Sequence, residues 1–259
     1  MSTSVTRDVW ENFRRLTPAR VALGRAGNAL PTSEVLALAL AHARARDAVH
    51  IPLDVASIEQ ACGALGFDAI RVHSAARDRT TYLHRPDLGR RLAGDNAARL
   101  SSCCGPFDLS FVIGDGLSSP AVQTNAPLLL EALKPRLDHS RFSVAPVVIA
   151  EQARVALGDE IGGCLHARMS VVLIGERPGL SACDSLGVYL TLAPRIGRTD
   201  AERNCISNIR PAGLDCQTAA ERLFWLIEEA FRMGKSGVAL KDASDLRLAV
   251  VDATALNAQ

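Results

Sequence analysis

Three carboxylates each stand just after an apolar run of strand length. They are Asp115 after residues 109–113, Glu151 after residues 144–150 and Glu176 after residues 169–174. The carboxyl ends of neighbouring parallel strands lie at one edge of a sheet, and ligands bind at that edge in α/β proteins. These side chains could therefore converge on one ligand, and periodicity alone favours a binding site there.

Glu176 belongs to the segment Gly175-Glu176-Arg177-Pro178-Gly179, which places a carboxylate and a guanidinium beside a turn fixed by proline. Taken alone, Glu176 would pair with Arg177 or cap the turn. About thirty residues later the segment 203–209 carries Cys205 and Asn208. Taken alone, Cys205 would be a small buried apolar residue.

Common catalytic patterns are incomplete in this sequence. Gly114-Asp115-Gly116 follows an apolar run, but Ser119 stands where a dinucleotide-binding loop has its third glycine. A tight turn with Ser118 or Ser119 capping the next helix explains the loop better. The sequence has no G-x-S-x-G, H-E-x-x-H or C-x-x-C pattern and no complete catalytic constellation. A stand-alone nucleotide-binding α/β enzyme remains an alternative.

The composition is that of an ordinary globular protein, with 48% apolar and 22% charged residues, which excludes a disordered chain. The formal charge of +1 provides no basic field for nucleic acid. The longest apolar runs are far shorter than the roughly 20 residues of a membrane helix, and the start lacks the apolar region of a secretory signal. Seven irregularly spaced cysteines favour reduced thiols over disulfides or zinc.

The first part of the chain is predicted to be helical. A helix from Thr32 or Ser33, either of which can cap it, runs to Arg46, and a second begins at Asp54 and ends near Gly66. A short strand at 69–73 follows, and a charged helix is expected from Pro86 to about Leu100, with Arg90, Arg91 and Arg99 on a solvated face.

The remainder alternates strands and helices in the manner of a parallel sheet. Strands are predicted at 109–113, 144–150, 169–174 and 187–192. The predicted helices are one that contains Leu128 to Leu137, one around 155–165 and one over 218–233. The expected fold is α/β, with a mainly parallel, Rossmann-like sheet flanked by helices. The expected division is an N-terminal helical arm and small α/β lobe (1–105), a main α/β domain (106–241) and a C-terminal extension of uncertain structure (242–259).

Four segments in matching order resemble the small subunit of ethanolamine ammonia-lyase, an adenosylcobalamin-dependent enzyme. They are residues 82–92, 115–118, 175–180 and 203–209. The likeness runs from about Val9 to Lys241 and is densest between Ile174 and Asn208.

The resemblance implies a set of cofactor-binding residues. Glu176 matches a glutamate that binds cobalamin, and a carboxylate can accept hydrogen bonds from the corrin amide arms without competing for cobalt. Cys205 and Val155 match two further contacts, by packing or backbone rather than by thiolate chemistry. Asp115, Arg177 and Asn208 are expected neighbours. The resemblance implies no metal ligand or catalytic residue in this chain.

The resemblance also implies a division of labour between two chains. A barrel-shaped heavy chain holds ethanolamine and converts it to acetaldehyde and ammonia, and the light chain helps to enclose the cofactor at the subunit interface. This chain alone is expected to be inactive, and its N-terminal arm is expected to grip the partner. A cofactor-free structural subunit is the other alternative.

The cofactor is expected to be base-on. None of the six histidines has a persuasive partner, and the sequence lacks the Asp-x-His-x-x-Gly segment that supplies histidine to cobalt in base-off proteins. The likeness begins within the first ten residues, which leaves little room for an encapsulation arm. A cytosolic enzyme is therefore expected, and a location in a bacterial microcompartment remains the alternative.

Overall fold

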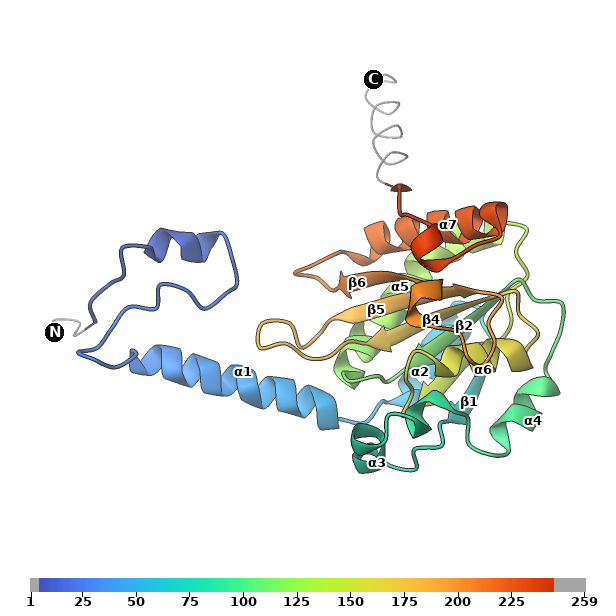
Figure 1. The fold of residues 1–259 in the computed structure, drawn as a ribbon, viewed down its shortest axis with the longest axis horizontal. Coiled ribbons are helices and arrows are strands. Elements are labelled where there is room, and N and C mark those ends of the chain that lie inside the picture. The colour runs from blue at the N-terminus through green and yellow to red at the C-terminus, as the bar shows by residue number, and fades with distance from the viewer. Residues whose placement is uncertain (1–4, 245–259) are drawn as a thin grey trace, which may run out of the picture.

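The computed structural model describes residues 5–244, and its centre is a six-stranded sheet in the order β1-β3-β2-β4-β5-β6 (Figure 1). The strands are β1 (Ala69–His73), β2 (Leu109–Gly114), β3 (Val147–Glu151), β4 (Met169–Gly175), β5 (Leu186–Leu192) and β6 (Arg203–Ile209). The pairs β1–β3, β3–β2 and β2–β4 are parallel, whereas β4–β5 and β5–β6 are antiparallel. The predicted mainly parallel α/β sheet is confirmed, with an antiparallel hairpin added at one edge.

Helices cover the two faces of the sheet unequally. One face packs against α2 (Val55–Ala64), α5 (Ser119–His139) and α7 (Cys216–Met233), which together bury the larger apolar core. The opposite face packs against α4 (Asn96–Ser101) and α6 (Leu157–Cys164) in a smaller core. We call this second side the α6 face. Strands β2 and β4 are buried along their whole length between the two layers, as their continuous apolar sequences predict.

Side-chain caps fix where three of these helices begin. Asp54 accepts a hydrogen bond from the Ser57 backbone N–H (3.1 Å), and Ser118 accepts one from the Ala121 N–H (3.3 Å). Asp215 caps α7 in the same way, and Gly234 ends that helix in the left-handed conformation (φ 66°). The predicted starts at Asp54 and Ser118 are confirmed.

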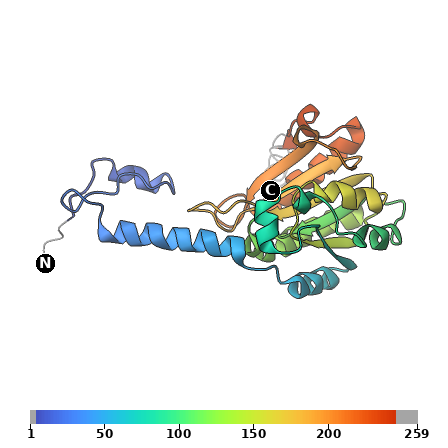
Figure 2. The ribbon, with the colours of Figure 1, turned by 60° about the horizontal axis from the view of Figure 1, so that its bottom comes forward.

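An N-terminal arm extends away from the sheet in both views (Figures 1 and 2). It contains the short 3₁₀ helix η1 (Glu11–Arg15) and the helix α1 (Thr32–His50). The predicted cap was wrong, because Pro31 holds the N-cap position and no side chain caps the helix. Helix α1 also continues past Arg46 and ends just before Ile51, which precedes a proline and is extended.

The predicted charged helix between Pro86 and Leu100 is wrong. The helix α3 (Arg79–His84) precedes the proline, the 3₁₀ turn η2 (Leu88–Arg90) follows it, and Arg91 is extended. Tertiary contacts override the helical pattern here: a Cβ at Gly89 would lie 3.1 Å from both Tyr82 and Arg154 side chains. The Leu92 N–H also leaves the helical pattern to donate to the Glu160 carboxylate (3.0 Å).

Strand β1 lies in the predicted N-terminal lobe but pairs with β3, so the sheet crosses residue 105. The proposed domain division stays a prediction. The short 3₁₀ helices η3 (Asp200–Glu202) and η4 (Gly237–Ala239) complete the elements of the described chain. Within residues 5–244, no helix combines the length and the hydropathy needed to cross a membrane. Of the predicted extension at 242–259, residues 245–259 lie outside the described residues.

Candidate functional site

A cavity of about 1090 Å³ opens on the α6 face, beside the carboxyl ends of β2 and β4. Its walls come from the α3–η2 region, the loop after β2, the loop between β3 and α6, the loop after β4, strand β5 and residues 196–203. Of the sequence-predicted site residues, Val155, Glu176 and Arg177 line this cavity directly.

Glu176 is held in place by three donors from two other segments. Ser185 Oγ donates to Oε2 (2.5 Å), Ser207 Oγ donates to Oε1 (2.5 Å), and the Asn208 backbone N–H donates to Oε2 (3.3 Å). A carboxylate offers about four acceptor positions, so this one retains capacity for a further donor. The side chain is an ordered hydrogen-bond acceptor at the cavity wall.

The antiparallel hairpin explains why these segments meet. Gly175 at the end of β4 pairs with Leu186 at the start of β5, and Leu186 pairs with Ile209 at the end of β6. The loop after β4, the start of β5 and the end of β6 therefore lie together, although they are far apart in the sequence. Gly187 leaves room for Glu176, because a Cβ there would lie 3.0 Å from Oε1.

Cys205 lies on the same face of the sheet as Glu176. It pairs across the strands with Tyr189, which lines the cavity and packs against the core of the α6 face. The residue is exposed overall rather than buried. Desolvation nevertheless raises the pKa of the Cys205 thiol, a hydrogen bond with Tyr189 opposes this rise, and the Glu176 carboxylate adds to it. The thiol is therefore protonated at neutral pH, which suits a packing surface rather than a nucleophile.

Asp115 takes a supporting position beneath the cavity. Its carboxylate is 3% exposed and accepts hydrogen bonds from the backbone N–H groups of Gln152 (2.9 Å) and Ala153 (2.8 Å). Burial raises its pKa to about 6, opposed by the Ala153 N–H and by the Arg79 guanidinium 3.4 Å away. Asp115 thus fixes the loop that carries Val155 rather than facing the cavity itself.

Asn208 contributes its backbone to the site. Its N–H holds Glu176, while its side-chain Oδ1 accepts a hydrogen bond from Arg210 Nε (2.7 Å). The residue has a positive φ of 61°, a conformation that asparagine tolerates better than most residues. It turns the chain at the end of β6 so that its N–H reaches the carboxylate.

Glu151 does not join the other carboxylates. Along β3, Val147 and Ile149 belong to the core on the α5 side, and Glu151 follows them in the period-2 alternation. Its charge acts on Arg71 of β1, whose pKa it helps to raise. The expected convergence of three strand-end acids is therefore wrong for Glu151, because the strand ends with that side chain on the opposite face.

A buried ion pair that the sequence analysis missed connects two walls of the cavity. Arg203 of β6 donates to both carboxylate oxygens of Asp159 in α6, each at 2.7 Å, and both side chains are at most 3% exposed. Arg203 also donates to Thr191 Oγ1 (3.0 Å). A period-2 interpretation of residues 203–209 as a strand would have placed Arg203, Cys205 and Ser207 on one face.

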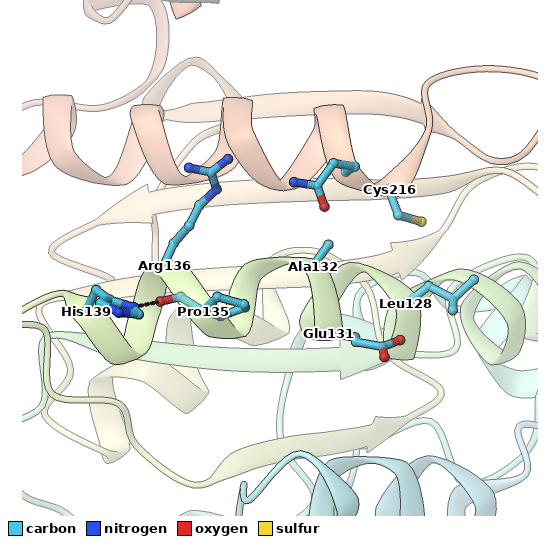
Figure 3. Close-up of a pocket in the computed structure, with 8 residues that line it drawn as sticks. Leu128, Glu131, Ala132, Pro135, Arg136, His139 and Cys216 are labelled. Atoms are coloured by element: carbon cyan, nitrogen blue, oxygen red, sulfur yellow. Dashed lines mark hydrogen bonds between the residues drawn. The ribbon is translucent and has the colours of Figure 1, made fainter. Parts of the chain in front are cut away.

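A second hollow of about 760 Å³ lies between α5 and α7 (Figure 3). Arg136 reaches from α5 towards α7, where it pairs with Glu221 (2.7 Å), and His139 Nδ1 lies 2.6 Å from the carbonyl oxygen of Pro135. The Arg136 and His139 side chains are therefore paired within the chain. None of the predicted site residues lines it.

Residues 5–244 contain no cluster of three or more histidine, cysteine or carboxylate side chains arranged to hold a metal ion. All seven cysteines lie in this range, and each is a free thiol. The predicted reduced state of the cysteines agrees with this arrangement.

The comparisons with known proteins identify the family. A family model described as Ethanolamine ammonia-lyase light chain (EutC) matches residues 7–241. The chain belongs to the ethanolamine ammonia-lyase light-chain family. The resemblance found in the sequence is thereby confirmed.

Curated relatives in the ethanolamine ammonia-lyase light-chain family match nearly the whole chain. A protein of Azotobacter vinelandii is 54% identical over 93% of this chain and 91% of its own length. One of Xanthomonas campestris pv. campestris is 52% identical over 97% and 95%, and one of Ralstonia nicotianae is 51% identical over 95% and 92%. Each is named ethanolamine ammonia-lyase small subunit.

Proposed function

We propose that this chain is the light chain of an adenosylcobalamin-dependent ethanolamine ammonia-lyase, and that the cavity on the α6 face encloses part of the cobalamin against a heavy chain. The observation that carries the proposal is Glu176. Its carboxylate is fixed by Ser185, Ser207 and Asn208 at the wall of an open cavity and keeps acceptor capacity.

The residues present fit a corrin edge. The periphery of cobalamin is a ring of amide arms, whose N–H groups are donors for Glu176. Val155 and Tyr189 are partly buried apolar surfaces on the same side, and Cys205 lies beside Tyr189. Arg177 lines the cavity next to Glu176, and within residues 5–244 its side chain makes no hydrogen bond or ion pair, so it is available to a carbonyl of an amide arm.

Asp115 and Asn208 support these contacts from behind. Asp115 holds the loop of residues 152–155, and Asn208 orients Glu176 through its N–H. The bound cofactor supplies the radical chemistry through homolysis of its cobalt–carbon bond. The work of this chain is then to bind and orient the corrin edge and to exclude water from it.

A base-on cofactor is consistent with the cavity walls. No histidine is among the residues of the described chain that line the cavity. We therefore include a base-on cofactor in the proposal, in which its own nucleotide base would be the lower ligand of cobalt. The substrate and the reacting atoms belong to the heavy chain, so this chain is inactive alone.

Coexpression with a heavy chain tests the proposal. The two chains are expected to copurify, to show the visible spectrum of bound cobalamin after addition of adenosylcobalamin, and to deaminate ethanolamine. Neither chain alone should deaminate ethanolamine. If the heavy chain alone bound adenosylcobalamin as tightly as the complex does, this chain would instead be a cofactor-free structural subunit.

A further inference from the structure

One wall of the cavity is cationic and takes no part in the contacts of Glu176. It consists of Arg90 and Arg91, at and after η2, and of Arg154 in the loop before α6, and we call it the arginine wall. The Arg154 backbone N–H donates to the Gly89 carbonyl oxygen (2.8 Å), which ties the two segments together. Because a Cβ at Gly89 would lie 3.1 Å from the Arg154 side chain, glycine permits this close approach.

The Arg154 guanidinium is fixed in position but incompletely paired. Its Cζ lies 4.6 Å from the centre of the Tyr82 ring, and Nη2 donates to the Tyr82 carbonyl oxygen (3.2 Å). Tyr82 is itself anchored, because its hydroxyl donates to the Ala153 carbonyl oxygen (3.1 Å). Arg154 Nε is buried and has no hydrogen-bond partner within the described chain. A buried donor without an acceptor is costly, so the chain itself leaves this guanidinium incompletely satisfied at the cavity wall.

The side chains of the other two arginines keep donors that this chain does not occupy. Within residues 5–244, the Arg90 side chain makes no hydrogen bond or ion pair, and the Arg91 side chain makes only a long ion pair, with Nε 3.8 Å from Glu160 Oε2. The acid beside them, Asp87, is already paired with Arg85, whose Nη2 lies 2.7 Å from Oδ2. The arginine wall therefore has an excess of positive charge that this chain does not neutralise.

The chemistry of the arginine wall differs from that of Glu176. Arginine presents a planar set of donors that matches the oxygens of a phosphate, whereas a carboxylate repels phosphate and accepts from neutral amides. Cobalamin carries both kinds of group, amide arms around the corrin and one phosphodiester in its nucleotide loop. We propose that the arginine wall binds this phosphodiester, while Glu176 binds the amide side. This inference rests on the proposed function.

The test compares three corrinoids bound to the complex of this chain with its heavy chain. Adenosylcobalamin and adenosylcobinamide phosphate carry the phosphate, and adenosylcobinamide lacks it. Affinities are measured by equilibrium dialysis, without any activity assay. Arg154→Gln is expected to weaken binding of both phosphate-bearing corrinoids about 10-fold or more, the size of a lost charge-assisted hydrogen bond, and to leave adenosylcobinamide within about 2-fold.

Three further variants and a second ligand make the result decisive. Arg154→Lys keeps the charge but not the planar donor set. Arg90→Gln changes an exposed side chain that makes no contact needed by the fold. Both variants should weaken binding of the phosphate-bearing corrinoids relative to adenosylcobinamide, but less than Arg154→Gln does. Arg141→Gln removes an exposed arginine that does not line the cavity and should change nothing. Inorganic phosphate alone is expected to bind weakly.

Several outcomes would overturn the inference. Equal weakening of all three corrinoids by Arg154→Gln would mean that Arg154 only supports the loop. No weakening by any arginine variant, with Glu176→Ala still weakening every corrinoid, would remove the phosphate site and leave the proposed function intact. Tight binding of inorganic phosphate without corrinoid would assign the arginine wall to a free anion. A complex that binds no corrinoid at all would remove both proposals.

Discussion

Replacing Arg203 with alanine is expected to lower the free energy of unfolding of the chain by about 3–5 kcal/mol, because it leaves a buried carboxylate uncompensated. Asp159 accepts both hydrogen bonds of this ion pair at 2.7 Å and is 3% exposed. The pair joins β6 to α6, and so joins the strand of Cys205 to the element that follows Val155. Chemical denaturation of the full chain measures the loss.

A surface ion pair of similar length provides the matched control. Arg168 and Asp108 lie 2.8 Å apart, but the arginine side chain is 65% exposed, so Arg168→Ala should cost only about 0–1 kcal/mol. The double variant Arg203→Met with Asp159→Leu should recover most of the stability, since it removes both charges together. If Arg203→Ala costs no more than Arg168→Ala, the ion pair does not hold the cavity walls together.

The variant Leu36→Glu with Leu40→Glu is expected to weaken association with the heavy chain by about 100-fold or more, since burying each leucine contributes about 1.5–3 kcal/mol. The run Val35 to Leu40 is apolar on every side of α1, yet Leu36 is 64% and Leu40 51% exposed in the isolated chain. A helix that is apolar all round is normally buried. We therefore infer that the heavy chain covers this part of the arm.

The location of the arm agrees with this role. Arg20 in the arm donates to the Leu180 carbonyl oxygen (3.4 Å) in the loop after Glu176, so one partner surface can cover both (Figures 1 and 2). The circular dichroism spectrum of the variant should match that of the parent, since the substituted side chains are exposed. Val238→Glu, one apolar-to-acidic change at a residue outside the arm that is 78% exposed, is the control. Normal assembly of the leucine variant would contradict the inference.

The fold could be predicted from the sequence where strands are buried on both faces. Strands β2, β3 and β4 are continuous apolar runs, and each was found within a few residues of its bounds. Strand β6 was not identified as a strand, because Asn204, Ser207 and Asn208 interrupt its apolar residues and the strand is only partly buried. The charged helix after Pro86 failed because contacts of Gly89 and Leu92 outweigh helical propensity.

The site could be predicted only in part for a related reason. Strand ends identified Glu176 and Asp115, but the side to which each carboxylate turns depends on pairing and register. Glu151 therefore lies on the α5 side of the sheet instead of the α6 face, and Asp115 accepts hydrogen bonds from the β3–α6 loop instead of facing the cavity. The donors Ser185 and Ser207 reach Glu176 only because β5 pairs with β4 and β6 pairs with β5, so that the start of β5 and the end of β6 lie near the end of β4. No local sequence pattern indicates this pairing.

The affinity of the assembled complex for adenosylcobalamin after Glu176→Ala tests the central claim most directly. We expect the dissociation constant to rise about 10- to 100-fold, because a hydrogen bond to a charged acceptor contributes about 1.5–3 kcal/mol. The control is Glu151→Ala, which removes another strand-end carboxylate on the opposite face and should leave affinity unchanged. An intact Glu176→Ala complex that binds adenosylcobalamin as tightly as the parent would contradict the account.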